Sequence, residues 1–240
     1  MSKIIKNILN LQTIRTGQQA NVNDSIEEAW LFISIKNRQF TRTYIDWFID
    51  YCHFENRNGV ICPVDAPYRF NKMAELNIDQ LSLKEENKHT QVSWEVSRKV
   101  QKALNAKNSS FVRIQSWNEL DTNTPKDLKS EISDAFKARG LFYSTIISHV
   151  AYMKECDDLA IIERYCKFFL AELPVLFYVY YRGEQIIDVY PGEQPIFFRQ
   201  FEEGMFEKEL PICTQFIKNG HPFIYMQTYK EAELSEISPM

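Results

Sequence analysis

Two side chains in this 240-residue chain stand where they could do nucleophilic and acid–base chemistry. Ser34 ends a short apolar run, and a hydroxyl at the end of a buried strand lies close to the backbone N–H groups that open the next helix. Glu172 lies within "FFLAELPVLFYVYY" (168–181), and a carboxylate in such apolar surroundings can bind an ammonium ion and exchange protons with it. Each residue also has a plainer explanation. Ser34 could be a cap or turn residue, and Glu172 could face solvent or pair with Arg164.

A third candidate is a basic run within a long polar segment that is expected to be helical. Its members are Lys88, Arg98, Lys99, Lys102 and Lys107. Arg98 and Lys102 share a helix face at i, i+4, and Lys99 joins Lys102 at i, i+3. Nearby glutamates dilute the run, so a solvated surface and a nucleic-acid contact are both open. Because the net charge is −4, a contact with nucleic acid must come from a local patch of this kind.

The sequence has no signature of a metal site, a hydrolase motif, a signal peptide or a membrane span. The five cysteines include no CxxC pair, and the four histidines lie far apart, so we expect reduced thiols, no metal site and no cofactor. Ser34 does not lie in the GxSxG motif of the α/β-hydrolases. No uninterrupted apolar stretch is long enough for a signal peptide or a membrane span, so a cytoplasmic protein is expected.

The elements that must position these residues alternate between strands and helices. Apolar or alternating runs predict strands over 29–35, 59–64, 111–117, 185–192 and 222–227. Helical patterns are expected within 36–52 and over 68–76, 82–106, 128–140, 142–155 and 158–173, with a polar loop over 118–127. This alternation predicts an α/β fold: a single Rossmann-like domain with a mostly parallel sheet and helices on both faces. No linker divides the chain, so residues 1–240 are expected to form one domain.

Taken together, the motifs that contain these residues resemble those of the tRNA-dependent cyclodipeptide synthases. The family has an apolar strand that ends in glycine, an aliphatic residue and a nucleophilic serine, and "LFISIKN" matches this pattern at Ile33 and Ser34. The family also has a tyrosine, three residues and then Glu-aliphatic-Pro, which "FFLAELP" matches from Glu172 onward. Downstream, "DVYPG" supplies Tyr190 and Pro191, which look like the family's second catalytic tyrosine and the proline that marks one of its two subfamilies. The motifs follow in the family's order over roughly residues 29 to 200.

The resemblance implies an aminoacyltransferase that uses two aminoacyl-tRNAs and no ATP. Its fold would be similar to the catalytic domain of class I aminoacyl-tRNA synthetases. A ping-pong scheme would pass through an acyl-enzyme on Ser34 and a dipeptidyl-enzyme, and would release a diketopiperazine. Ser34, Glu172 and Tyr190 are then the expected catalytic residues, and a monomer without metal or cofactor is expected. The tRNA-binding residues expected from the resemblance are Arg98, Lys99 and Lys102, and the substrate-binding residues are Trp30, Phe32, Asn37, Phe168, Asp188 and Pro191.

The chain departs from the family pattern at two motif positions. Phe168 stands where the family has its tyrosine, and Phe32 stands where it has glycine. Tyr165, two turns before Glu172, could supply a hydroxyl or belong to the core, and the core is preferred. Trp30 and Phe32 add bulk beside Ser34 and argue against a large first substrate.

Which two amino acids are joined stays open. Asp188 could select a cationic or histidine side chain, or it could be a solvent-exposed acid on an edge strand. Two other functions compete with the enzyme: a catalytically silent Rossmann-like module that binds tRNA, and a serine esterase.

Overall fold

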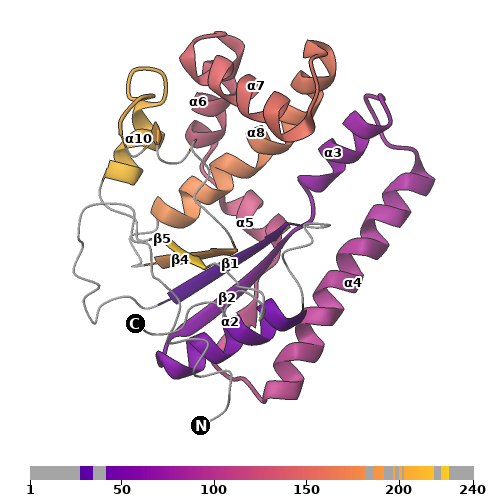
Figure 1. Ribbon diagram of the computed structural model, residues 1–240, viewed down its shortest axis with the longest axis vertical. Helices are drawn as coiled ribbons and strands as arrows, with labels where there is room; N and C mark the ends of the chain where they lie inside the picture. Colours follow the sequence, from indigo (N-terminus) through magenta and orange to yellow (C-terminus); the bar gives the residue numbers. More distant parts are fainter. Residues whose placement is uncertain are drawn as a thin grey trace, which may run out of the picture.

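The sheet of this protein is parallel and doubly wound. The computed structural model describes residues 28–34, 42–181, 186–191, 197, 200–201, 203–218 and 223–226. Within them, five parallel strands form one sheet in the order β3-β2-β1-β4-β5 (Figure 1). The strands are β1 (Glu28–Ser34), β2 (Asn58–Val64), β3 (Val112–Ile114), β4 (Ile186–Pro191) and β5 (Phe223–Met226). The strand order runs outward from β1 in both directions, as in Rossmann-type folds.

The central strands β1 and β2 are buried over almost their whole length. They pair in register from Glu28 with Asn58 to Ser34 with Val64. Their sequences are continuous apolar runs, because strands with a helical layer on both faces have no solvent side to mark with polar residues. Gly59 allows the layers to come close, since a Cβ there would lie 2.6 Å from the Cys52 sulfur.

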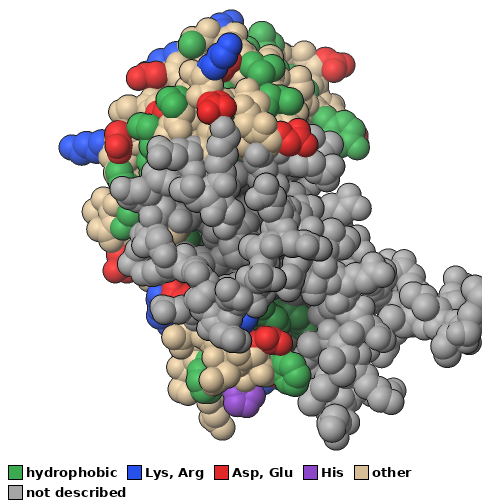
Figure 2. All heavy atoms as spheres, turned by 90° about the vertical axis from the view of Figure 1, so that its left-hand side faces the viewer, with side chains coloured by type: hydrophobic (Ala, Val, Ile, Leu, Met, Phe, Trp, Pro, Cys, Tyr) green, Lys and Arg blue, Asp and Glu red, His purple; other side chains and the backbone are tan. Residues whose placement is uncertain are grey.

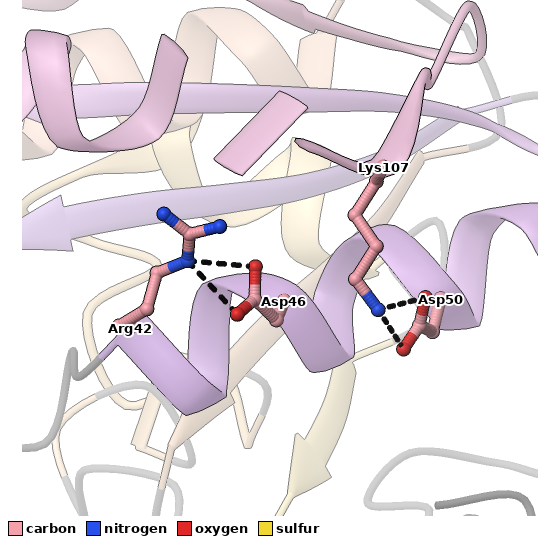
Figure 3. A network of polar contacts seen from close by, with 4 residues as sticks. All are labelled: Arg42, Asp46, Asp50 and Lys107. Atoms are coloured by element: carbon pink, nitrogen blue, oxygen red, sulfur yellow. Dashed lines mark hydrogen bonds and ion pairs between the residues drawn. The ribbon is translucent and has the colours of Figure 1, made fainter. Parts of the chain in front are cut away.

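One face of the sheet is covered by α2 (Arg42–Phe54) and α4 (Leu83–Lys107) (Figure 1). Lys107, the last residue of α4, donates hydrogen bonds to both carboxylate oxygens of Asp50 in α2, at 2.7 and 2.6 Å (Figure 3). Within α2, the Arg42 Nε donates to both oxygens of Asp46 at 2.8 Å (Figure 3). The contact between Lys107 and Asp50 therefore joins the two helices that cover this face. The β1 residues that pack on this side are Ala29, Leu31 and Ile33.

The other face of the sheet is covered by a larger helical layer (Figure 1). Its helices are α5 (Trp117–Asn123), α6 (Lys126–Lys137), α7 (Leu141–Lys154), α8 (Leu159–Tyr181) and α10 (Pro211–Lys218), and α3 (Tyr68–Glu75) packs against α8. From β1, Trp30 and Phe32 enter this second core cluster. The prediction of a mostly parallel sheet with helices on both faces is therefore confirmed.

Three segments differ from the sequence-based expectation. The polar loop expected over 118–127 is largely helical, because α5 occupies 117–123 and buries Trp117 and Leu120. The helix expected to end at Leu173 continues through Pro174 as α8. The third strand is only three residues long.

Carboxylates from distant segments cap two helix starts. The Glu209 carboxylate accepts hydrogen bonds from the backbone N–H groups of Leu141 and Phe142 at 2.7 and 2.9 Å, at the start of α7. Glu131 of α6 likewise accepts from Ile212 and Cys213 at 2.9 Å each, near the start of α10. Both contacts satisfy backbone donors that have no partner within the helix, and they place negative charge at the positive end of the helix dipole.

Candidate active site

The candidate site lies at the carboxyl edge of the sheet, where β1 separates β2 from β4. Ser34 is the last residue of β1 and pairs with Val64, the last residue of β2. On its other side, β1 pairs in parallel with β4. The two halves of the sheet diverge at this junction, and ligands of doubly wound sheets bind at such a switch point, beside the carboxyl ends of the strands. The predicted nucleophile therefore stands at the edge of the sheet where folds of this class bind their ligands.

The alternation of β1 determines which face Ser34 occupies. Trp30 and Phe32 pack into the cluster under α8, whereas Leu31 and Ile33 pack into the cluster under α2 and α4. Because successive side chains of a strand point to opposite faces, Ser34 shares the face of Trp30 and Phe32. Ser34 is partly exposed, as a residue at the end of a buried strand must be if it is to meet a substrate.

Glu172 reaches the same face of the sheet from α8. It is half-buried, and its negative charge helps to raise the pKa of Cys62 well above the usual thiol value. The largest cause of that raised pKa is burial, followed by the charges of Asp65 and then Glu172. Cys62 belongs to the same core cluster as Phe32 and pairs with it in register. The carboxylate of Glu172 is therefore within electrostatic range of the strands that end at Ser34.

Arg164, one of the partners expected for Glu172, pairs with another acid in the structure. Glu172 is half-buried, and its charge acts on Cys62 of β2. Arg164, the alternative partner, forms its ion pair with Asp79 at 3.8 Å. Pro174 lies two residues farther along the helix and has no N–H, so it removes the hydrogen bond that the Leu170 carbonyl would otherwise accept. The backbone next to Glu172 is thus interrupted where the sequence motif has its proline.

Aromatic rings fill the space beneath Ser34. The rings of Trp30 and Phe32 stack with centroids 5.6 Å apart, and Phe32 meets Trp117 of α5 edge-on at 6.4 Å. All three side chains are buried. The indole N–H of Trp30 donates to Glu28 at 3.1 Å, which satisfies its only polar atom. The bulk that the sequence predicts beside the nucleophile is therefore present and tightly packed.

Phe168 and Tyr165 lie differently with respect to Glu172. Phe168 is one helical turn before Glu172, at i, i+4, and is buried against Phe169. Tyr165 is partly buried and packs beside the core cluster, with the Lys154 ammonium 4.4 Å from its ring centroid. The pKa of Tyr165 is raised by burial and then by the negative charge of Glu75 on α3. Tyr165 therefore packs at the margin of the core cluster, in agreement with the preferred expectation that it is core.

For the remaining motif residues, the structure gives the backbone register of their strand. Asp188 of β4 pairs with Trp30 of β1, and Tyr190 lies two residues closer to the carboxyl edge. Since β4 runs between β1 and β5, Asp188 is on an interior strand, and its interpretation as an edge-strand acid is wrong. Pro191 is the last residue of the strand, and Asn37 lies outside the described residues.

The basic run divides into paired and unpaired members. Lys88 pairs with Glu85 at 3.0 Å, and Lys107 pairs with Asp50. Arg98, Lys99 and Lys102 are exposed, and none has an acidic partner among the residues that the structure describes. Within the basic run, these three are the members without an ion pair in the described residues, and they are the residues expected to bind tRNA.

On the side of the molecule that faces the viewer in Figure 2, the described side chains carry both signs of charge intermingled. Among the described residues, no group of three His, Cys, Asp or Glu side chains could hold a metal ion. None of the helices in the described ranges combines the length and apolarity that a bilayer crossing needs.

Comparison with solved structures identifies the fold class: it is the Rossmann-like α/β fold of the cyclodipeptide synthases. A cyclodipeptide synthase from Bacillus thermoamylovorans superposes with a TM-score of 0.72 at 14% identity, over 95% of this chain and 100% of that one. A Mycobacterium tuberculosis protein superposes with a TM-score of 0.59 at 13% identity, over 76% of this chain and 81% of that one. Its structure relates cyclodipeptide synthetases to type I tRNA synthetases.

A third structure, from Candidatus Glomeribacter gigasporarum, is a cyclodipeptide synthase bound to Phe-tRNAPhe. It superposes with a TM-score of 0.57 at 12% identity, over 85% of this chain and 88% of that one. By sequence, no family model and no curated protein matches the chain. The likeness is therefore one of fold over nearly the whole chain.

Proposed function

We propose that this protein is a cyclodipeptide synthase that joins two aminoacyl groups, taken from two aminoacyl-tRNAs, into a diketopiperazine. One observation carries the proposal: Ser34 and Glu172, 138 residues apart in the sequence, occupy one face of the sheet beside its switch point. The fold is shared with cyclodipeptide synthases over 95% of the chain, and one enzyme of that fold was captured with Phe-tRNAPhe. We further propose that residues 1–240 form a single catalytic domain that acts as a monomer in the cytoplasm.

In the first proposed step, the Ser34 hydroxyl attacks the ester carbonyl carbon of one aminoacyl-tRNA. The bond from that carbon to the tRNA ribose oxygen breaks, the tRNA leaves with the serine proton, and an ester forms on Ser34. An aminoacyl ester is already activated, so neither ATP nor a histidine base is required if the reacting groups are well positioned. Backbone N–H groups at the carboxyl edge of the sheet are suited to hold the developing oxyanion.

In the second step, the amine of the Ser34-bound aminoacyl group attacks the ester carbonyl of the second aminoacyl-tRNA. A peptide bond forms, the second tRNA leaves, and the dipeptide remains on Ser34. The free amine of the dipeptide then attacks the Ser34 ester, which closes the ring and returns the proton to the serine oxygen. Two aminoacyl-tRNAs thus give one diketopiperazine and two free tRNAs.

Glu172 is assigned the binding and deprotonation of the reacting ammonium. Each amine must lose a proton before it attacks, and a half-buried carboxylate can accept that proton and pass it to the leaving ribose oxygen. Tyr190 is assigned as a second catalytic group at the carboxyl end of β4, next to the strand that bears Ser34.

The remaining assignments concern binding. We assign Asn37, Phe168, Asp188 and Pro191 to the walls of the substrate site, and Arg98, Lys99 and Lys102 to the tRNA phosphates. Trp30 and Phe32 are assigned to the pocket for the first aminoacyl side chain. Their rings already fill the space under Ser34, which favours a small first substrate such as a glycyl or alanyl group.

The experiment that tests the function is expression of the chain in a bacterial host, followed by untargeted mass spectrometry of the culture medium. We expect at least one diketopiperazine that is absent from cells expressing the Ser34→Ala variant at the same level. Equal amounts of product from both cultures would refute Ser34 as the nucleophile. If purified protein binds tRNA and neither culture contains a product, the chain is a silent tRNA-binding module, which the phenylalanines at positions 32 and 168 would then explain.

A further inference from the structure

An exposed tryptophan lies on the basic surface of α4. The side chain of Trp94 has 61% of its surface exposed, and the Arg98 guanidinium lies 5.2 Å from the centroid of its ring. The other three tryptophans serve the fold: Trp30 and Trp117 are buried, and Trp47 stacks on Tyr51. Trp94 is about 200° around the helix from Val96, and so it lies off the apolar stripe that packs α4 against the sheet. Packing within the described residues therefore does not explain Trp94.

The charges around Trp94 favour an anionic ligand. Arg98 contacts the indole ring, and Lys102, about 80° around the helix from Trp94, has no acidic partner in the described part of the chain. The acid next to the tryptophan in sequence, Glu95, accepts a hydrogen bond from Gln91 at 3.4 Å, and the Asp65 carboxylate accepts one from Ser93. An aromatic face with a guanidinium on it and a further cation nearby is the combination that binds unpaired nucleotides, because the ring stacks on a base while the cations hold the phosphates.

The position of Trp94 links this surface to the candidate active site. Its neighbour Ser93 donates a hydrogen bond from its hydroxyl to the carboxylate of Asp65. Asp65 directly follows Val64, which pairs with Ser34. Summing the strand spacing, two Cα–Cα steps and one side-chain contact gives a span of at most about 20 Å from Ser34 to Trp94. A few unpaired nucleotides can cover that span.

We propose that Trp94, together with Arg98, stacks on an unpaired base near the 3′ end of the aminoacyl-tRNA while its ester is bound at Ser34. The inference rests on the proposed function and adds a base-stacking residue to it. Single-stranded RNA is recognised chiefly by stacking of splayed bases on aromatic and arginine planes, which this pair provides. Lys102 would then contact a phosphate next to the stacked base.

Binding measurements with two Trp94 variants, one control variant and two RNAs test the proposal. The probes are total bacterial tRNA without amino acids and the same tRNA shortened by its four unpaired 3′ nucleotides. We expect Trp94→Ala to weaken binding of intact tRNA about tenfold, in the range that loss of a stacked base produces, and to weaken binding of the shortened tRNA less than twofold. Trp94→Tyr keeps an aromatic face and is expected to stay within about threefold of the unaltered protein. The matched control is Tyr152→Ala, which removes an 84% exposed aromatic ring from α7 and should change neither affinity.

The salt dependence of binding separates stacking from charge. Trp94→Ala should leave the slope of log affinity against log salt unchanged, whereas Arg98→Gln should reduce it by up to about 0.7, the value for one phosphate contact on a single strand. Addition of intact tRNA should also quench the exposed indole emission, and Trp94→Phe should abolish that quenching. Equal losses with both RNAs, or no loss on Trp94→Ala, would overturn the inference.

The failure of this proposal can be told apart from the failure of the proposed function. If the unaltered protein makes diketopiperazines and Trp94→Ala has the same KM for aminoacyl-tRNA, the stacking role alone is wrong. If the unaltered protein makes no product, and Trp94→Ala nevertheless weakens binding of intact tRNA, the stacking role stands and the chain only binds RNA. If the unaltered protein binds no tRNA, both proposals are wrong.

Discussion

Removal of the Phe32 ring should enlarge the site for the first aminoacyl group. The ring is 6% exposed and lies between Trp30 and Trp117, so Phe32→Ala leaves a void on the Ser34 face of the sheet. Each methylene that a substrate buries there contributes about 0.8 kcal/mol. A leucyl side chain carries three more carbons than an alanyl one. If most of that gain is realised, the preference shifts by about 2 kcal/mol, or roughly 30-fold in kcat/KM.

The same substitution has a cost in stability, which a matched control measures. Loss of a buried phenylalanine side chain lowers the free energy of unfolding by about 3–5 kcal/mol, a large part of the total for a typical domain. The control is Leu31→Ala, at the neighbouring residue of β1. Leu31 is fully buried on the opposite face, and its truncation costs about 2–5 kcal/mol. Both variants should therefore lose stability, and only one should change its products.

The assay is mass spectrometry of the medium from cells grown at low temperature, with urea unfolding of the purified proteins alongside. We expect Phe32→Ala to raise the ratio of products that contain a large residue to products that contain glycine or alanine, and Leu31→Ala to keep the original ratio. An unchanged product ratio in folded Phe32→Ala would refute the assignment of Phe32 to the substrate pocket. A similar shift in both variants would show that destabilisation, and not pocket shape, alters the products.

Three further predictions concern α8, a helix cap and a buried thiol. Phe168→Tyr places a hydroxyl one turn from Glu172, and a new hydrogen bond of about 1 kcal/mol should raise the rate of product formation roughly fivefold; a rate at or below that of the unaltered protein would contradict this. Glu209→Ala removes the acceptor of two backbone N–H groups and should lower the free energy of unfolding by about 2 kcal/mol in urea, whereas truncation of the exposed Glu203 should change it by less than about 0.5 kcal/mol. Burial raises the pKa of Cys166 to about 12, so the folded state keeps a proton that the unfolded state releases above about pH 8.5. Stability should therefore fall as pH rises from about 8.5 toward 12, and Cys166→Ala should reduce the loss between pH 7.5 and 10 by about 2 kcal/mol; equal losses in both proteins would disprove the effect.

The parts of the fold that could be predicted are those that local pattern determines. The apolar runs of β1 and β2 are long enough to be recognised without knowledge of their partners, and so is the amphipathic pattern of α2 and α4. The segment that forms α5 is rich in asparagine, aspartate and threonine, which favour turns in isolation. It is helical because Trp117 and Leu120 are anchored in the core, and such an anchor is not visible in a local window. Likewise, the cap that Glu131 provides for α10 comes from about 80 residues away.

The candidate site consists of residues that a sequence motif singles out. Ser34 and Glu172 stand out by their residue types in apolar surroundings, and strand alternation then determines the face that Ser34 occupies. The sequence could not decide whether Asp188 lies on an edge strand, because strand order depends on contacts between distant segments. Trp94 was missed, although a signal was available: it lies off the stripe of Val96, Val100 and Leu104 and four residues before Arg98.

The central claim is that Ser34 carries an aminoacyl group between two tRNAs. The most direct test mixes the purified protein with charged total tRNA in the absence of ATP, stops the reaction within seconds and measures the intact protein mass. We predict that a fraction of the protein gains the mass of an aminoacyl residue, that fragmentation places this mass on Ser34, and that diketopiperazine accumulates while the adduct turns over. Product formation at an undiminished rate by Ser34→Ala, or an adduct on another residue, would contradict the claim.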